Sequence, residues 1–156
     1  MKRHYNTKEK RQLKPGETYN FLVLNKITIS NDAEYFVLLD DFGEKHLLPA
    51  LYYKNYPIKI KEYYPCYVDK INCQGRIFLE PEHPFYQLNK VYEFEINGVE
   101  TIYSHSGFES NYHKMAGNNG EFAYLPVELI KGEIQKGILK CRISRIKKAK
   151  IFLELI

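Results

Sequence analysis

Alternating apolar and polar residues predict β-strands along most of this chain. The clearest case is the range 91–96, where Tyr92, Phe94 and Ile96 alternate with Glu93 and Glu95, as expected for a strand that buries one face. Similar segments, separated by turn residues, predict strands at 18–29, 33–39, 44–48, 112–116 and 121–125, with hairpins over 65–80 and 139–154. We expect short helical turns at 50–56 and 127–130, and a flexible loop rich in Ser, Gly and Asn at 97–111.

The second half of the chain repeats features of the first half in the same order. The hairpins over 65–80 and 139–154 both end in Ile-Phe-Leu-Glu, and Cys66 and Cys141 occupy the same position in them. These features predict an internal duplication of a unit of about 70 residues. The matches that precede each hairpin are Tyr19-x-Phe21-x-Val23 with Tyr92-x-Phe94-x-Ile96, Tyr35 with Tyr112, and Gly43-Glu44 and Leu48-Pro49 with Gly120-Glu121 and Leu125-Pro126.

Each copy has the order of elements of a small barrel. Five strands with a short helical or irregular link between the third and the fourth are typical of the OB-fold. We therefore expect an all-β protein of two tandem five-stranded OB-fold barrels, at 13–81 and 89–156. The Pro-containing segment 82–88 should be an extended connector, and residues 1–12 should be a mobile basic arm because they contain almost no apolar residues.

Positive charge is concentrated in two places. The net charge is +4 in the chain and also in residues 1–12, −2 in residues 13–86 and +2 in residues 87–156. A few cations on an edge strand are enough to keep strands from aggregating. The segment 136–150 carries more cations than this requires, which predicts contact with a polyanion. Between residues 136 and 150 there is no acidic residue and there are seven cations: Lys136, Lys140, Arg142, Arg145, Lys147, Lys148 and Lys150.

Both copies resemble S1-type RNA-binding domains, which are one branch of the OB-fold. The segments that carry the likeness are Glu34-Tyr-Phe-Val-Leu, Gly43 to Leu51, Cys66 to Glu80, and Gly137 to Glu154. The resemblance implies that Phe36 and His113 are outward-facing rings of the second strand, and that Leu47 and Tyr124 occupy the outward position of the third. The chain departs from the family pattern at Leu47, which cannot stack on a base as a ring can.

The second copy offers both chemical features that single-stranded nucleic acid requires, namely flat rings and cations. Phe122 and Tyr124 should share one face of a strand, with His113 nearby. An equal alternative is that Phe122 and Tyr124 are buried against the first copy. The candidate nucleic-acid-binding residues are Phe36, His113, Phe122, Tyr124, Lys140, Arg142, Arg145, Lys147 and Lys148.

Other chemistry has little support in the sequence. The three cysteines lack Cys-x-x-Cys spacing, so we expect no metal site, and Cys66 and Cys141 should be small core residues. His46 should face the core as a hydrogen-bonded structural histidine. No phosphate-binding glycine loop or nucleophile with an oxyanion device is evident, which predicts a non-catalytic protein without a cofactor.

Two functions therefore remain. The first is a cytoplasmic module that binds single-stranded nucleic acid, with RNA favoured over DNA and no membrane association, since the chain lacks an apolar run or secretory signal. The second is an adaptor that binds a partner protein through Tyr-rich barrel surfaces. The tyrosines between Tyr52 and Tyr67, interleaved with lysines, could track a strand or instead plug a barrel and contact its neighbour, which we favour.

Overall fold

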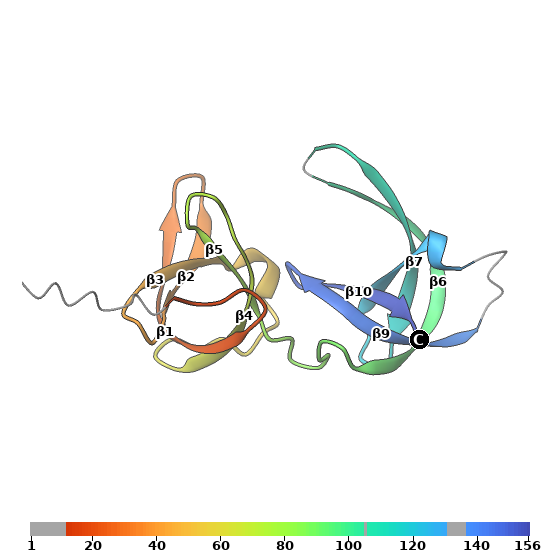
Figure 1. The fold of residues 1–156 in the computed structure, drawn as a ribbon, viewed down its shortest axis with the longest axis horizontal. Helices are drawn as coiled ribbons and strands as arrows, with labels where there is room; N and C mark the ends of the chain where they lie inside the picture. The colour runs from red at the N-terminus through yellow and green to blue at the C-terminus, as the bar shows by residue number, and fades with distance from the viewer. Residues whose placement is uncertain (1–11, 105, 131–136) are drawn as a thin grey trace, which may run out of the picture. The chain divides into compact units, whose positions relative to one another are not determined.

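The protein is all-β, with two five-stranded sheets (Figure 1). The computed structural model describes residues 12–104, 106–130 and 137–156. The chain divides into two compact units, Met1–Glu82 and His83–Ile156, here called unit 1 and unit 2. The predicted basic arm falls almost entirely on residues 1–11, which lie outside the described residues. No helix in the described part of the chain has the length and apolar character needed to cross a membrane.

Unit 1 is a sheet of antiparallel neighbours in the order β3-β2-β1-β4-β5. The third and fifth strands, β3 and β5, are therefore the edge strands of this sheet. A 3₁₀ helix, η1, follows the third strand, where a short helical turn was predicted. The elements are β1 (Thr18–Ile29), β2 (Ala33–Leu39), β3 (Lys45–Pro49), η1 (Leu51–Tyr53), β4 (Tyr63–Ile71) and β5 (Ile77–Pro81).

Unit 2 has the same sequence of elements, but its strands close into a hydrogen-bonded ring in the order β10-β8-β7-β6-β9. The closing pair is β8 with β10, which run parallel and align Ile151 with Ala123 and Phe152 with Tyr124. The elements are β6 (Val91–Tyr103), β7 (Glu109–Gly117), β8 (Phe122–Pro126), η2 (Val127–Leu129), β9 (Ile138–Lys147) and β10 (Lys150–Leu155).

Ring closure changes how well the last strand is buried. Ile151 and Leu153 of β10 are almost completely buried, whereas the equivalent Ile77 and Leu79 of β5 are half-buried. The two sets of inward residues otherwise match, and Cys66 and Cys141 are both buried and free, as predicted. Burial raises the pKa of both thiols, that of Cys141 to about 11.

The two units make the same hydrogen bonds at equivalent positions. The backbone amide of Lys14 donates to the Tyr19 hydroxyl at 2.9 Å, and that of Gln87 donates to the Tyr92 hydroxyl at 3.0 Å. Both units also contain a left-handed residue at the start of the first strand and another in the second turn. The further matched pairs are Gly16 N to Val68 O with Asn89 N to Ile143 O, Val68 N to Glu17 O with Ile143 N to Lys90 O, and Asp40 N to Glu44 O with Gly117 N to Glu121 O.

The predicted loop at 97–111 is wrong. β6 continues to Tyr103 and pairs with β7 as far as the Tyr103–Glu109 pair, which makes a long hairpin (Figure 1). Val99, Thr101, Ile102 and Tyr103 are good strand formers. Some of the Ser and Gly residues that suggested a loop lie in the turn after Tyr103, whereas Gly98 and Ser110 lie within β6 and β7. The segment 82–88 also differs from a simple connector, because Tyr86 belongs to the core of unit 2.

One corner of unit 1 is held by a buried carboxylate. Asp40 is 6% exposed. Its Oδ1 accepts hydrogen bonds from the backbone amides of Phe42 and Glu44, at 2.8 and 2.9 Å, and His46 Nε2 donates to its Oδ2 at 2.8 Å. The His46 ring also meets the buried Phe21 ring edge-on, with centroids 5.9 Å apart. The prediction of a core-facing structural histidine is therefore confirmed.

Unit 2 fills the same corner with an aromatic ring. Gly117 and Ala123 stand at the positions of the carboxylate and the imidazole, and Tyr86 stacks on Phe94, the counterpart of Phe21, with ring centroids 5.7 Å apart. The Tyr86 hydroxyl donates to Asn119 Oδ1 at 2.7 Å. A Cβ at position 117 would collide with that hydroxyl, so the corner requires glycine once the tyrosine is present.

We predict that Gly117→Ala destabilises unit 2 by about 1–3 kcal/mol, because the added methyl group overpacks a filled site. Tyr86→Phe removes the atom that collides most severely. The double variant should therefore lose less stability than the sum of the single variants in urea denaturation. Strictly additive losses would contradict the proposed collision.

We also predict that Asp40→Asn lowers the free energy of unfolding of unit 1 by about 1–3 kcal/mol at neutral pH. Burial acts to raise the pKa of Asp40, but hydrogen bonds from His46 and two backbone amides outweigh it and hold the pKa below its ordinary value of 3.8. This stabilisation is complete above the unfolded-state pKa and is lost as the pH falls through the lowered folded-state pKa.

The difference between wild type and Asp40→Asn should therefore shrink as the pH is lowered below about 4. Urea denaturation at neutral and acidic pH measures this, with Asp41→Asn, a change at the exposed neighbouring carboxylate, as the matched control. A difference that is absent at neutral pH, or that stays constant in acid, would show that the Asp40 hydrogen bonds do not stabilise the fold.

Candidate nucleic-acid interface

The register of β7 and β8 decides which side chains of unit 2 face outward. Ala123 and Leu125 are buried in the core, so the alternate residues Phe122 and Tyr124 lie on the outer face of β8. Tyr124 is aligned with Lys114 of β7. The prediction that Phe122 and Tyr124 share a face is confirmed.

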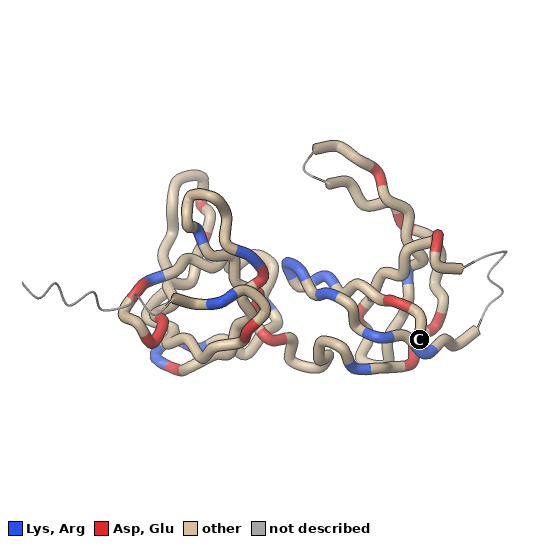
Figure 2. The backbone as a smooth tube through the Cα atoms, in the orientation of Figure 1, with Lys and Arg blue, Asp and Glu red and all other residues tan. Residues whose placement is uncertain are grey.

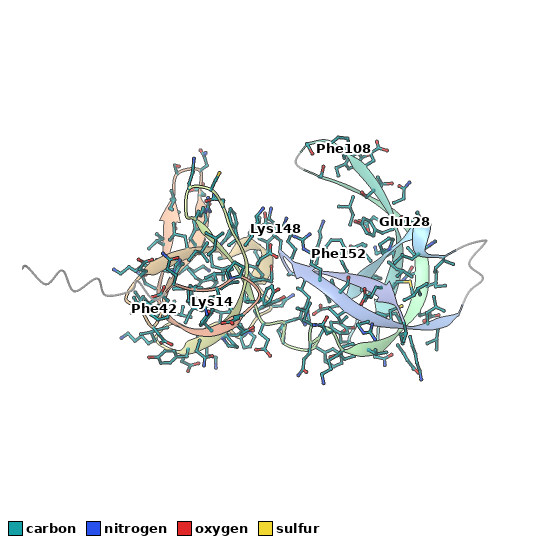
Figure 3. All side chains as sticks on the ribbon, viewed as in Figure 1. Lys14, Phe42, Phe108, Glu128, Lys148 and Phe152 are labelled. Carbon is teal, nitrogen blue, oxygen red and sulfur yellow. The ribbon has the colours of Figure 1, made fainter. Side chains whose placement is uncertain are left out.

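Three rings meet on this outer face. Tyr112 of β7, Tyr124 of β8 and Phe152 of β10 form a mutually contacting set, here called the aromatic triad. The centroid distances are 6.2 Å between Tyr112 and Tyr124, 5.6 Å between Tyr112 and Phe152, and 6.1 Å between Tyr124 and Phe152. All three are half-buried, so each ring leaves part of its surface open to solvent. Phe152 lies on β10, and Lys148 lies at the β9–β10 turn (Figure 3).

Phe122 extends the aromatic surface along β8. Its side chain is 41% exposed, and Lys114 Nζ lies 4.0 Å from the centroid of its ring. This distance is typical of a cation–π contact. A ring and a cation are thus already held together on the outer face.

Cations line the adjoining hairpin. Cys141 and Ile143 of β9 are buried, which places Lys140 and Arg142 on the outer face, as predicted. Arg145 is aligned with Phe152, one ring of the aromatic triad. Lys147 and Lys148 are at the β9–β10 turn, where Lys and Arg positions gather (Figure 2). Lys136 lies outside the described residues.

Two carboxylates moderate the positive charge of this face. Glu154 Oε1 lies 3.5 Å from Arg142 Nη1, and Oε2 of Glu100, on β6, lies 3.9 Å from Lys114 Nζ. Burial, and then the negative charge of Glu100, raise the pKa of Tyr124. The tyrosine is therefore neutral at physiological pH and presents an uncharged ring.

Two of the predicted site residues lie on the inner face of their sheet. Phe36 is 8% exposed and is aligned with the buried Leu48, so it lies on the inner face of unit 1. His113 is aligned with the buried Leu125, on the opposite face from Phe122 and Tyr124. The expectation that Phe36 and His113 point outward is therefore wrong, because a shift of one residue along a strand reverses the face.

The sequence-based selection also missed three residues of this face, Tyr112, Lys114 and Phe152. Strand parity could have found the first two, since they alternate with the apolar Met115. Phe152 was visible within the repeated Ile-Phe-Leu-Glu string, but its position beside Tyr124 depends on the β8–β10 pairing, which sequence alone does not reveal.

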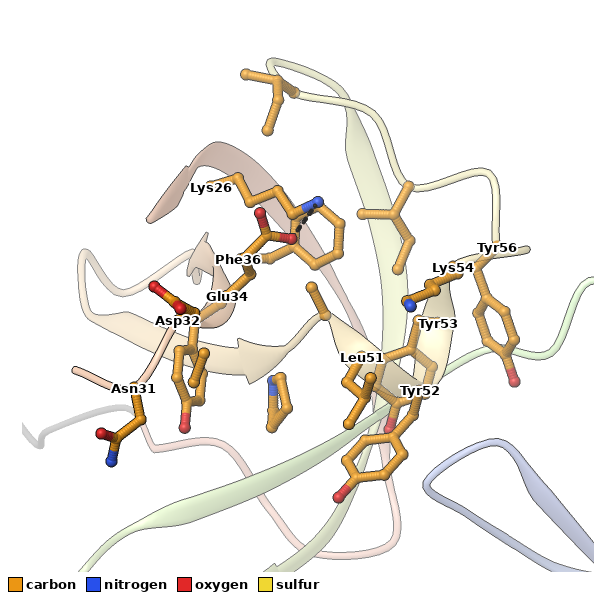
Figure 4. A pocket seen from close by; sticks show the side chains of 16 residues that line it. Lys26, Asn31, Asp32, Glu34, Phe36, Leu51, Tyr52, Tyr53, Lys54 and Tyr56 are labelled. Atoms are coloured by element: carbon orange, nitrogen blue, oxygen red, sulfur yellow. Dashed lines mark ion pairs between the residues drawn. The ribbon is translucent and has the colours of Figure 1, made fainter. Parts of the chain in front are cut away.

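The tyrosine-rich segment of unit 1 borders a pocket of about 930 Å³ between the β1–β2 hairpin and η1 (Figure 4). Tyr53 is buried, and its hydroxyl donates to Glu80 Oε1 at 3.0 Å. Burial and the Glu80 charge raise the pKa of Tyr53. Lys26 and Glu34 also line the pocket and form an ion pair, with 3.0 Å between Lys26 Nζ and Glu34 Oε2. Part of the segment thus fills the interior of unit 1, while Tyr52 is 40% exposed.

One set of possible metal ligands occurs among the described residues. Ligand atoms of Asp40, Glu44 and His46 lie within 4.8 Å of one another. The Asp40 carboxylate already accepts three hydrogen bonds there, and these explain the arrangement as a structural corner.

Comparison with known proteins does not assign the chain to a family. No family model matches its sequence, and no curated protein is significantly similar to it.

Proposed function

We propose that the protein binds single-stranded nucleic acid through the outer face of unit 2, without catalysis. The observation that carries this proposal is the aromatic triad, with Phe122 beside it and a cation-rich hairpin along its edge. Rings and cations occur together on one outer face, and the cations lie on strands directly bonded to those that hold the rings.

The fold supports the proposal. We infer that both units are OB-folds that arose by duplication, with the ring of unit 2 closed and that of unit 1 open. The first strand of unit 2 pairs with the second and the fourth, and the third pairs in parallel with the fifth, in keeping with a five-stranded Greek-key barrel. OB-folds bind oligonucleotides on the face of strands two and three, which here are β7 and β8.

The chemistry of the face suits a strand of unpaired bases. Stacking on an aromatic side chain contributes about 1–3 kcal/mol per base and depends little on sequence. The half-buried rings are held by their neighbours, so little side-chain entropy is lost on binding. Cations of β9 and of the β9–β10 turn would neutralise phosphates, and RNA is the favoured ligand because of the resemblance to S1-type domains.

A protein partner is the second candidate. The observation that favours it is the far end of the β6–β7 hairpin, where Tyr103 and Phe108 are 64% and 74% exposed. This end contains Glu109 and is less suited to a polyanion.

We predict that fluorescent oligo-U binds the protein and that its affinity falls about 20-fold between roughly 50 and 200 mM salt, as expected for about three neutralised phosphates. Changing Arg145, Lys147 and Lys148 together to Glu should abolish this binding. A matched control changes Lys54, Lys59 and Lys90, which are exposed elsewhere, to Glu. Oligo-dT run in parallel tests the preference for RNA.

The rings are tested separately. Tyr124→Ala should weaken oligo-U binding about 5- to 150-fold, and Tyr124→Phe, which keeps the ring, should bind nearly as wild type does. Circular dichroism and thermal melting confirm that the variants remain folded. Absence of binding by wild type at low salt would overturn the proposal and leave the protein partner as the better candidate.

A further inference from the structure

Unit 1 contains a counterpart of one ring and one cation of the proposed interface. Phe78 of β5 stands in the repeated Ile-Phe-Leu-Glu string at the position of Phe152. In unit 1 Lys70 is aligned with Phe78, and in unit 2 Arg145 is aligned with Phe152. Both hairpins thus place a cation of the fourth strand directly opposite a ring of the fifth.

The same irregularity produces both alignments. In unit 1 the register skips Asp69 between Val68 and Lys70. In unit 2 it skips Ser144 between Ile143 and Arg145. A bulge of this kind inserts an extra residue and redirects the side chain that follows it. The two hairpins therefore share the bulge that sets a cation of the fourth strand opposite a ring of the fifth.

Two cations lie close to the ring in unit 1. Lys70 Nζ lies 5.0 Å from the centroid of the Phe78 ring, and Arg76 Cζ lies 5.1 Å from it. Both distances fall within the range of cation–π contacts. Phe78 is half-buried, while Lys70 and Arg76 are exposed, so both charges can reach a ligand that lies against the ring.

We propose that Phe78, Lys70 and Arg76 form a second subsite for the same single strand, which stacks one base on Phe78 and holds the adjoining phosphates with the two cations. This inference rests on the proposed function of unit 2 and adds to it a binding role for unit 1. The residue that serves unit 1 is then Phe78 on the fifth strand rather than Phe36 on the second.

The subsite is weaker than the interface of unit 2. Leu47 and Val37 stand at the positions of Tyr124 and Lys114, so the outer face lacks a ring and a cation that unit 2 has. β3 and β5 are also the unpaired ends of the sheet of unit 1, and no parallel pairing fixes the third strand beside Phe78. The subsite therefore adds affinity to a long strand and does not bind a short one tightly by itself.

The proposal predicts a dependence on oligonucleotide length. A strand of about 6 nucleotides can occupy one unit, whereas a strand of about 20 nucleotides can engage both. Wild type should bind the longer oligo-U more tightly, and Phe78→Ala should remove most of that gain, lowering affinity for the longer strand about 5-fold or more. Its affinity for the short strand should stay unchanged.

Three further variants complete the fluorescence titration. Phe42→Ala changes another phenylalanine of unit 1, one that is 38% exposed, and should leave both affinities unchanged. Phe78→Leu keeps apolar bulk without a ring and should behave as Phe78→Ala does, which separates stacking from local packing. Tyr124→Ala should weaken both the short and the long strand.

The outcomes are distinguishable. If wild type binds both lengths and Phe78→Ala binds the long strand as wild type does, the second subsite is wrong and the function of unit 2 stands. If wild type binds neither length, the proposed function itself fails. Equal losses for both lengths in a folded Phe78→Ala protein would also overturn the subsite, because the short strand should not require it.

Discussion

The parallel pairing of β8 with β10 is the constraint on which the candidate interface depends. It closes the ring of unit 2, covers Ile151 and Leu153, and aligns Phe152 with Tyr124. Full burial of an aliphatic side chain of this size contributes about 1.5–3 kcal/mol, so closure and core formation reinforce one another. Because β9 pairs with β10, the same closure carries Arg145 to the edge of the rings. Stability and the arrangement of the site thus share one cause.

Unit 1 has the same order of elements without that pairing. It keeps the bulged hairpin, the left-handed residues and the matched backbone hydrogen bonds. Its β3 and β5 remain ends of the sheet, and a buried Tyr53–Glu80 hydrogen bond links η1 to β5. At the corner where unit 2 stacks Tyr86 over Gly117, unit 1 joins Asp40 to His46. Two different sets of side chains therefore support one backbone plan.

The sequence could predict most strands because turn chemistry is local. Gly43 and Gly120 adopt positive φ in the same turn, and the alternation around Phe94 identifies the inner face. Pairings that are distant in sequence could not be predicted, so Phe152 was overlooked beside Tyr124. The resemblance to S1-type domains predicts the outer face for Phe36 and His113, whereas their pairing with the buried Leu48 and Leu125 places both on the inner face. The turn-like composition after Ile96 concealed the long β6–β7 hairpin, since composition does not show how few residues a tight turn needs.

The most direct test of the account is to map, by NMR, which backbone amides and aromatic side chains of the folded protein shift when oligo-U is added at low salt. The account predicts that the largest changes fall on the outer-facing residues of β7, β8 and β10, including the rings of Tyr112, Tyr124 and Phe152, and on β9 around Arg145. Changes confined to the far end of the β6–β7 hairpin or to the pocket beside η1, with the aromatic triad unaffected, would contradict it.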